Sequence, residues 1–174
     1  MKELNLFSAS SKVYKILSLC FCYPDQRFLD YAKGDLSRDL EGNLRELPYG
    51  KDIKKSSEIF ELALAQQLAR FKLEDLQIEY TGLFIYSYGG LSCFPYESIY
   101  REGNKRLMGD STIAVKTFYR NFKLRVGSRF ADLPDHIAAE LEFMHFLSLN
   151  GAKFAANGEG KNRELCITNK LTFL

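Results

Sequence analysis

The chain has 174 residues, of which 46% are hydrophobic and 26% charged, and its 24 basic residues against 22 acidic ones give a net charge of +2. This length is sufficient to bury a core, and the composition excludes disordered, collagen-like and coiled-coil proteins. The balanced charge gives no indication of binding to nucleic acid or to a membrane surface.

The first part of the chain predicts helices separated by short turns. The first helix is expected to begin at a serine cap within residues 8–11 and to end before Pro24. A second helix opens at Pro24 and Asp25. Residues 35–55 contain two glycines and a proline among many charges, which indicates short helical pieces and turns.

The middle of the chain predicts three further helices. One begins after a serine cap at residues 56–57, and the next runs from Glu74 to about Tyr86, before a Gly-Gly stop. Residues 91–105 are expected to form a loop. Residues 107–122 return to helical spacing of apolar side chains.

A long helix is the clearest element of the C-terminal part. Asp132 is expected to cap it, Pro134 lies in its first turn, and Asn150-Gly151 is expected to end it after about Leu149. No segment shows sustained alternation of apolar and polar residues, so the sequence predicts an all-α fold.

The whole chain, residues 1–174, is predicted to be a single helical-bundle domain. Residues 1–150 form the main bundle in this interpretation, and residues 151–174 form a linker and a short C-terminal segment. The glycines of residues 157–160 indicate a flexible linker, and residues 161–174 a short or truncated final helix.

Few residues indicate chemistry of the chain's own. The four cysteines have no paired zinc spacing, and no glycine-rich phosphate-binding motif is present. Glu142 and His145 have the spacing of a di-iron ligand pair, but such a site needs a second pair and two more glutamates. We therefore expect no metal site and no catalytic residue. Asp132 and Asp135 are also explained by the preference of carboxylates for a helix N-terminus.

Three short motifs resemble the TorD/DmsD/NarJ family of redox-enzyme maturation chaperones. They are Asp132–His136 with the helix that follows, Glu79–Phe84, and Pro95–Tyr100, followed by a Leu-Met-Gly segment at residues 107–109. The resemblance implies a mostly helical chaperone that is not an enzyme. It implies a partner too, namely the catalytic subunit of a molybdoenzyme, recognised through its N-terminal twin-arginine signal.

The resemblance also implies what the chaperone does for its partner. The client carries the molybdopterin cofactor and is held back from export until that cofactor is loaded, so we expect the chaperone to bind no cofactor stably. Weak GTP binding is reported for some family members. Such a chaperone acts in the cytoplasm; the apolar stretch at residues 16–23 is too short to span a membrane, and no cleavage site follows it.

The family's signal-binding positions correspond to Asp135 and His136 in this sequence. We expect Asp135 to contact a guanidinium group, and His136 to position the helix start or donate to the client backbone. Further carboxylates are available from Glu97 and Glu140. The remaining residues expected to border the client are Pro95, Tyr96, Tyr100, Tyr80 and Phe84.

Other interpretations stay open at this point. The chain fits a NarJ-like private assembly factor whose client lacks an export signal. A helical metal- or nucleotide-dependent enzyme is a third interpretation, and a structural adaptor a fourth. The tail ends on Leu171, Phe173 and Leu174, so a short final helix would leave an apolar face uncovered. We therefore predict a homodimer with exchange of the C-terminal tail.

Overall fold

The computed structural model describes residues 2–48, 70–88, 90, 93–102, 106–128 and 130–174, and these residues form helices without a named strand. The all-α prediction is confirmed. The elements are α1 (Lys2–Cys20), α2 (Gln26–Gly34), α3 (Leu36–Arg45), α5 (Leu73–Tyr80), the π-helical turn η1 (Thr81–Ile85), α6 (Glu97–Arg101), α7 (Asp110–Asn121), α8 (Ile137–Ala156) and α9 (Gly160–Phe173).

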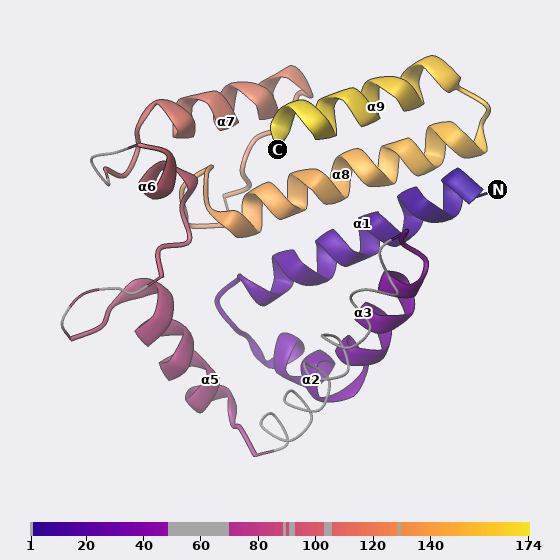
Figure 1. Cartoon of the computed structure of the whole chain (residues 1–174). Coiled ribbons are helices and arrows are strands. Elements are labelled where there is room, and N and C mark those ends of the chain that lie inside the picture. The colour runs from indigo at the N-terminus through magenta and orange to yellow at the C-terminus, as the bar shows by residue number, and fades with distance from the viewer. Residues whose placement is uncertain (1, 49–69, 89, 91–92, 103–105, 129) are drawn as a thin grey trace.

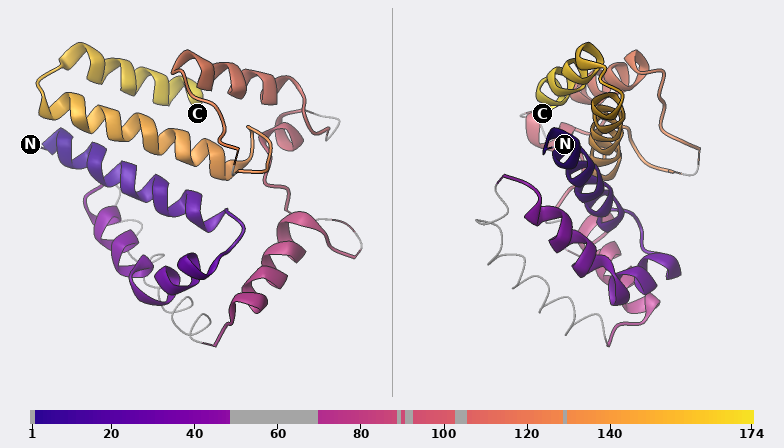
Figure 2. Two further views of the ribbon diagram at one scale, coloured as in Figure 1. Left: turned by 180° about the vertical axis from the view of Figure 1, so that it is seen from behind. Right: turned by 90° about the vertical axis from the view of Figure 1, so that its right-hand side faces the viewer.

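Helix α8 lies at the centre of the molecule, between α1 and α9, and α7 continues the α9 side of the layer (Figure 1). Two further views show α2 and α3 on the other side of α1, and α5 apart from α8 (Figure 2). Helix α1 packs against both α8 and α3, and α8 packs against both α1 and α9. No helix in the described ranges is long and apolar enough to cross a membrane.

The core has two parts that meet along α1 and α8. One part joins Val13 and Ile16 of α1 to α2 and α3, and Leu36 is only 1% exposed there. The other part joins α7 and α8 through aromatic contacts, and Phe143 and Leu147 are buried at its centre. Burial of such side chains supplies most of the folding free energy.

Helix α1 begins at Lys2, several residues before the predicted serine cap, so that prediction is wrong. Of the predicted cap serines, Ser11 instead faces α8, and so does Ser18 further along α1. The Ser11 hydroxyl lies 2.9 Å from Nδ1 of His145, and the Ser18 hydroxyl donates to the carbonyl of Ala138 at 2.8 Å. These hydroxyls are satisfied by long-range partners and therefore do not mark a helix end.

Two other elements, α2 and the one at residues 74–86, agree with the prediction. Asp25 caps α2 and accepts the backbone N–H of Phe28 at 2.8 Å. Helix α5 and η1 together occupy the predicted 74–86 element. The predicted helix that begins after residues 56–57 lies outside the described residues. The predicted loop at 91–105 is wrong in part, since it contains the short helix α6.

Helix α8 starts at Ile137 and ends at Ala156, so both predicted ends are wrong. Gly151 does not stop the helix because it lies against the ring of Phe7, where a Cβ would overlap that ring. Residues 151–156 therefore belong to α8 and not to a linker. A turn with Gly158 in the left-handed region then leads directly into α9, whose Phe173 packs on α7 and α8.

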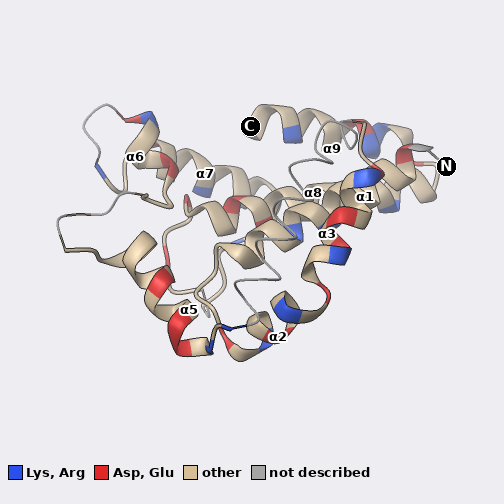
Figure 3. Ribbon diagram, turned by 60° about the horizontal axis from the view of Figure 1, so that its bottom comes forward, with Lys and Arg blue, Asp and Glu red and all other residues tan. Residues whose placement is uncertain are grey.

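Charged residues are distributed along the described α-helices, and none of these helices carries a continuous basic face (Figure 3). Helix α5 has acidic residues in its first turn, and α9 has Lys170 near its C-terminal end. This distribution fits the small net charge of the sequence.

Candidate functional site

Two of the sequence motifs meet at the junction between α6 and α8. An isolated antiparallel bridge pairs Tyr96 with His136. It is closed by two backbone hydrogen bonds, from Glu97 N–H to the Asp135 carbonyl at 3.0 Å and from Ile137 N–H to the carbonyl of Pro95 at 2.8 Å. The structure thus places the Pro95–Tyr100 and Asp132–His136 motifs side by side.

Asp135 is fully buried at this junction, with 0% of its surface exposed. Its Oδ2 atom accepts the backbone N–H of Ser98 at 3.1 Å, in the first turn of α6. This bond satisfies a free N–H at the start of α6 and explains why a helix forms inside the predicted loop. The Oδ1 atom has no hydrogen-bond partner among the described residues.

His136 takes the capping position that the sequence assigned to Asp132. It is 2% exposed, and its Nδ1 accepts the N–H of Ala138 at 3.1 Å, at the first turn of α8. The rings of Tyr96 and Phe130 lie edge-on to the imidazole, with centroids 5.4 and 5.5 Å away. Burial lowers the pKa of His136, which keeps Nδ1 free to accept this bond.

Asp132 lies on the exposed side of the junction. Its Oδ1 accepts the hydroxyl of Tyr96 at 2.8 Å and the N–H of Leu133 at 2.8 Å, and its Oδ2 lies 3.8 Å from Nε2 of His136. Burial, followed by the hydrogen bond and charge of Asp132, raises the pKa of the Tyr96 hydroxyl, which therefore stays a donor.

Glu97, Asp135 and Glu140 form a group that we call the carboxylate cluster. Burial first, and then the charges of Glu97 and Asp135, raise the pKa of Glu140 to about 8, although Arg101 acts in the opposite direction. Glu97 forms an ion pair with Arg101 at 2.7 Å. Oε1 of Glu140 is buried and has no partner among the described residues. The cluster therefore holds more anionic groups than Arg101 alone balances.

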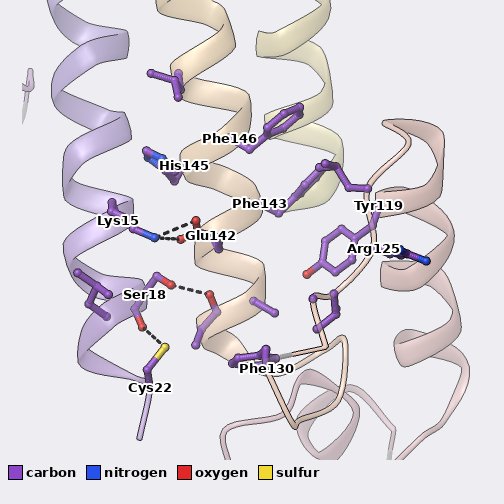
Figure 4. A pocket seen from close by; sticks show the side chains of 17 residues that line it. Lys15, Ser18, Cys22, Tyr119, Arg125, Phe130, Glu142, Phe143, His145 and Phe146 are labelled. Atoms are coloured by element: carbon purple, nitrogen blue, oxygen red, sulfur yellow. Dashed lines mark hydrogen bonds and ion pairs between the residues drawn. The ribbon is translucent and has the colours of Figure 1, made fainter. Parts of the chain in front are cut away.

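A groove of about 460 Å3 lies between α1, α8 and the connector residues 124–127 and 130, and we call it the α1–α8 groove. Lys15 of α1 forms an ion pair with Glu142 of α8 at 2.8 Å, on the α1 side of α8, whereas Tyr119 lies on the other side (Figure 4). The larger apolar residues that line the groove are Leu19, Leu124, Val126, Phe130, Phe143, Phe146 and Leu149.

Tyr119 connects the α1–α8 groove to the carboxylate cluster. It lines the groove, and its hydroxyl donates to the carbonyl of Pro134 at 3.1 Å. Burial raises its pKa, and the charges of Glu140, Asp135 and Glu97 contribute in the same direction. The sequence did not identify Tyr119, because a tyrosine among the apolar residues of a helix carries no signal of its own.

The other aromatic residues predicted for the site lie around it. The Tyr80 hydroxyl donates to the Phe21 carbonyl at 2.9 Å, and the ring of Phe84 is 4.9 Å from that of Tyr80. Burial first, and then the charges of Cys22 and Asp132, raise the pKa of Tyr80 to about 12. Tyr100 is 66% exposed and accepts the Phe94 N–H at 3.1 Å.

The contacts of Glu142 and His145 involve α1. Glu142 pairs with Lys15, and Nδ1 of His145 lies 2.9 Å from both the hydroxyl and the carbonyl oxygen of Ser11. Within the described part of the chain, no group of three or more His, Cys, Asp or Glu side chains is arranged to hold a metal ion.

Comparison with known proteins identifies the family. Residues 53–174 match the family described as nitrate reductase delta subunit. The chain belongs to this family. It is the NarJ/TorD family of redox-enzyme maturation chaperones, so the resemblance found in the sequence is confirmed. The match includes the carboxylate cluster, whereas α1, one wall of the groove, precedes it.

Two curated relatives of this NarJ/TorD family member are chaperones. The perchlorate reductase assembly chaperone protein of Dechloromonas aromatica is 28% identical over 155 residues, which are 88% of this chain and 66% of the relative. The chaperone protein TorD of Shewanella sp. strain ANA-3 is 28% identical over 151 residues, which are 85% of this chain and 70% of the relative. The chain thus spans about two thirds of the length of these relatives.

A solved structure agrees with these matches. The crystal structure of a protein described as a redox enzyme maturation protein from Archaeoglobus fulgidus matches with a TM-score of 0.56 and 28% identity, over 93% of this chain and 92% of that chain. The NarJ/TorD family member described here therefore shares both sequence and fold with that protein.

Proposed function

We propose that this chain is a cytoplasmic chaperone that binds the N-terminal segment of a molybdoenzyme catalytic subunit and holds it until its molybdopterin cofactor is loaded. In this proposal the segment is a twin-arginine signal, and the chaperone releases the client for export afterwards. The chaperone itself binds no cofactor stably and catalyses no reaction.

The observation that carries this proposal is the carboxylate cluster, whose Glu97 lines a pocket between α6, α7 and the end of α9, separate from the apolar α1–α8 groove. A twin-arginine signal presents two guanidinium groups followed by an apolar stretch that can form a helix. Carboxylates are the preferred partners of guanidinium groups, and an apolar groove receives the apolar face of a helix. The pocket at Glu97 also has apolar walls, from Val115 and Phe118 of α7 and Phe173 of α9, so it could receive a guanidinium group and an apolar side chain of one peptide.

The predicted contact between Asp135 and a guanidinium remains part of the proposal in a modified form. Asp135 is buried in this structure, and one of its oxygens holds the start of α6. A client arginine would therefore contact the more accessible Glu97. The negative charge of the buried Asp135 would strengthen the attraction without direct contact. His136 would support the same site through the start of α8.

The named relatives support the class of client. One is an assembly chaperone for perchlorate reductase, and another is TorD. We infer that the client of this chain is a redox enzyme of the same broad class. A NarJ-like client without an export signal would use the same site and would differ in its own N-terminus.

The test is to purify the tagged chain from its native host, grown anaerobically, and to identify the bound proteins by mass spectrometry. We expect the catalytic subunit of a molybdoenzyme, whose N-terminus then shows whether a twin-arginine signal is present. Glu97→Gln should reduce its recovery. Glu41→Gln is the matched control, because Glu41 and Glu97 have side chains that are both 22% exposed and both pair with an arginine four residues later.

Two outcomes would contradict the proposal. Recovery of no redox-enzyme subunit under these conditions would remove the chaperone function. Equal recovery of the client with Glu97→Gln and Glu41→Gln would show that binding of the client does not depend on the carboxylate cluster. Folding of each variant is checked by circular dichroism, so that a loss of the client is not a loss of the fold.

A further inference from the structure

We propose that Glu97 and Glu140 receive a guanidinium group of the client in the place that Arg101 now occupies, so that Arg101 is an internal stand-in for the client's arginine. This inference rests on the function proposed above and adds to it the identity of the binding pair and of the group that must leave. It makes Arg101 and Glu140 the residues that determine affinity at this site.

The first observation is the geometry of the Arg101–Glu97 pair. The guanidinium of Arg101 lies 2.7 Å from Glu97 within the short helix α6, so the site already holds the chemical group that it would bind. The Arg101 side chain is 67% exposed. An exposed ion pair of this kind contributes little to stability, so Arg101 can turn out to solvent at little cost.

The second observation is the presence of unpartnered buried oxygens in the carboxylate cluster. Oδ1 of the fully buried Asp135 and Oε1 of Glu140 have no hydrogen-bond donor among the described residues. Buried polar atoms without a partner are rare in folded proteins, and they indicate a missing donor. A guanidinium carries five N–H donors in a planar fork, which suits two or more carboxylates at once.

The third observation is the balance of charge around Glu140. The groups that act on it are Glu97 and Arg101 of α6 and Asp135 before α8, and it acts in turn on the Tyr119 hydroxyl of α7. The positive charge of Arg101 already lowers the pKa of Glu140, whereas burial and the two carboxylates raise it. A second guanidinium closer to Glu140 would lower this pKa further, so its binding releases a proton.

A proton released on binding makes the affinity depend on pH. Glu140 is mostly protonated below its folded pKa of about 8. The affinity for a guanidinium ligand should therefore rise with pH below that value, by up to about tenfold for each pH unit, and level off above it. Glu140→Gln keeps the shape of the side chain, but the amide cannot ionise. The affinity of this variant for a guanidinium ligand should therefore be lower than that of the wild type and nearly independent of pH.

The probe is a synthetic peptide with two consecutive arginines followed by an apolar stretch of leucine and alanine, and fluorescence anisotropy measures its binding to the full chain. Arg101→Gln should bind the peptide about two- to fivefold more tightly, because no internal arginine competes. Arg45→Gln is the matched control, since Arg45 pairs with Glu41 at the same spacing and with similar exposure, on α3. We expect it to bind like the wild type.

Displacement of Arg101 is measured directly by NMR. The Nε–Hε signal of Arg101, assigned through the Arg101→Gln variant, should move toward the position of a solvent-exposed arginine as peptide is added. A peptide with two lysines in place of the arginines should bind more weakly, because an ammonium cannot form the planar fork.

Equal or weaker binding by Arg101→Gln, or an unchanged Arg101 signal at saturation, would overturn the inference. If a redox-enzyme subunit nevertheless co-purifies with the wild-type chain, the chaperone function stands and only the exchange with Arg101 is refuted. If neither the peptide nor such a subunit binds the wild-type chain, both are refuted.

Discussion

Replacement of Glu140 by glutamine should remove a destabilising effect of high pH on the fold. The folded pKa of Glu140 is about 8, above the ordinary value of 4.5, and burial is the first cause. A group with a raised folded pKa favours folding when protonated, and this contribution is lost as pH rises from about 4.5 to about 8. The neutral amide of Glu140→Gln has no such dependence.

The size of the effect follows from the difference between the two pKa values. At about 1.36 kcal/mol for each unit of pKa, the difference sets an upper limit of about 5 kcal/mol. Because Glu140 keeps some contact with solvent, we expect a smaller value, about 1–3 kcal/mol. At pH 8.5 Glu140→Gln should therefore be more stable than the wild type by this amount, and at pH 4.5 nearly equal to it.

Urea unfolding, followed by circular dichroism at several pH values between 4.5 and 8.5, measures this difference. Protonation of His136 affects both proteins at low pH and cancels when the two are compared. Glu164→Gln is the control, because Glu164 is an exposed glutamate of α9. If the difference in free energy of unfolding between Glu140→Gln and the wild type stays constant from pH 4.5 to 8.5, the reasoning about Glu140 is refuted.

Three further predictions concern the packing that supports the site. Gly151→Ala should destabilise the fold by about 1–3 kcal/mol in urea unfolding, because its Cβ would overlap the Phe7 ring, whereas Gly42→Ala on α3, where nothing lies within 4 Å, should be neutral or stabilising. His136→Ala should cost at least the 0.5–2 kcal/mol typical of a lost N-cap, and His136→Asn less; the wild type alone should lose stability as pH falls through the lowered pKa of His136, and equal costs for both variants would contradict the capping role. Phe173→Ala should cost about 1–3 kcal/mol and speed amide hydrogen exchange in α9, since the ring contacts Phe118, Tyr119 and Phe143; unchanged exchange would show that α9 is held elsewhere.

The sequence predicts well those features that depend on neighbouring residues. Asp25 caps α2 as its residue type suggests, and the element at residues 74–86 is helical as its apolar spacing suggests. The ends of α8 were predicted wrongly, because Asp132 bonds to the distant Tyr96 and leaves the cap to His136. Gly151, read as a stop, is required by a contact with a helix that lies far away in the sequence.

The candidate site was predictable only in part for the same reason. The family motifs identified Tyr96, Glu97, Asp135 and His136, and the bridge between the two segments brings them together. The wall of the groove around Lys15 depends on the packing of α1 against α8, which no local pattern reports. Burial at the junction is likewise a property of the assembled helices, so the raised pKa of Glu140 was not foreseen.

The pairing of α1 with α8 has a consequence for synthesis on the ribosome. The partner of α1 begins at Ile137, so α1 waits for its partner while more than a hundred further residues are made. At translation rates of about 5–20 residues per second, this wait lasts roughly 6–25 seconds. During that time the apolar face of α1 lacks its final neighbour, and loop closure must bring distant segments together. The family of this protein assists the maturation of other enzymes, yet the apolar face of α1 is itself exposed for a time during synthesis. A general nascent-chain chaperone could bind that face during this time.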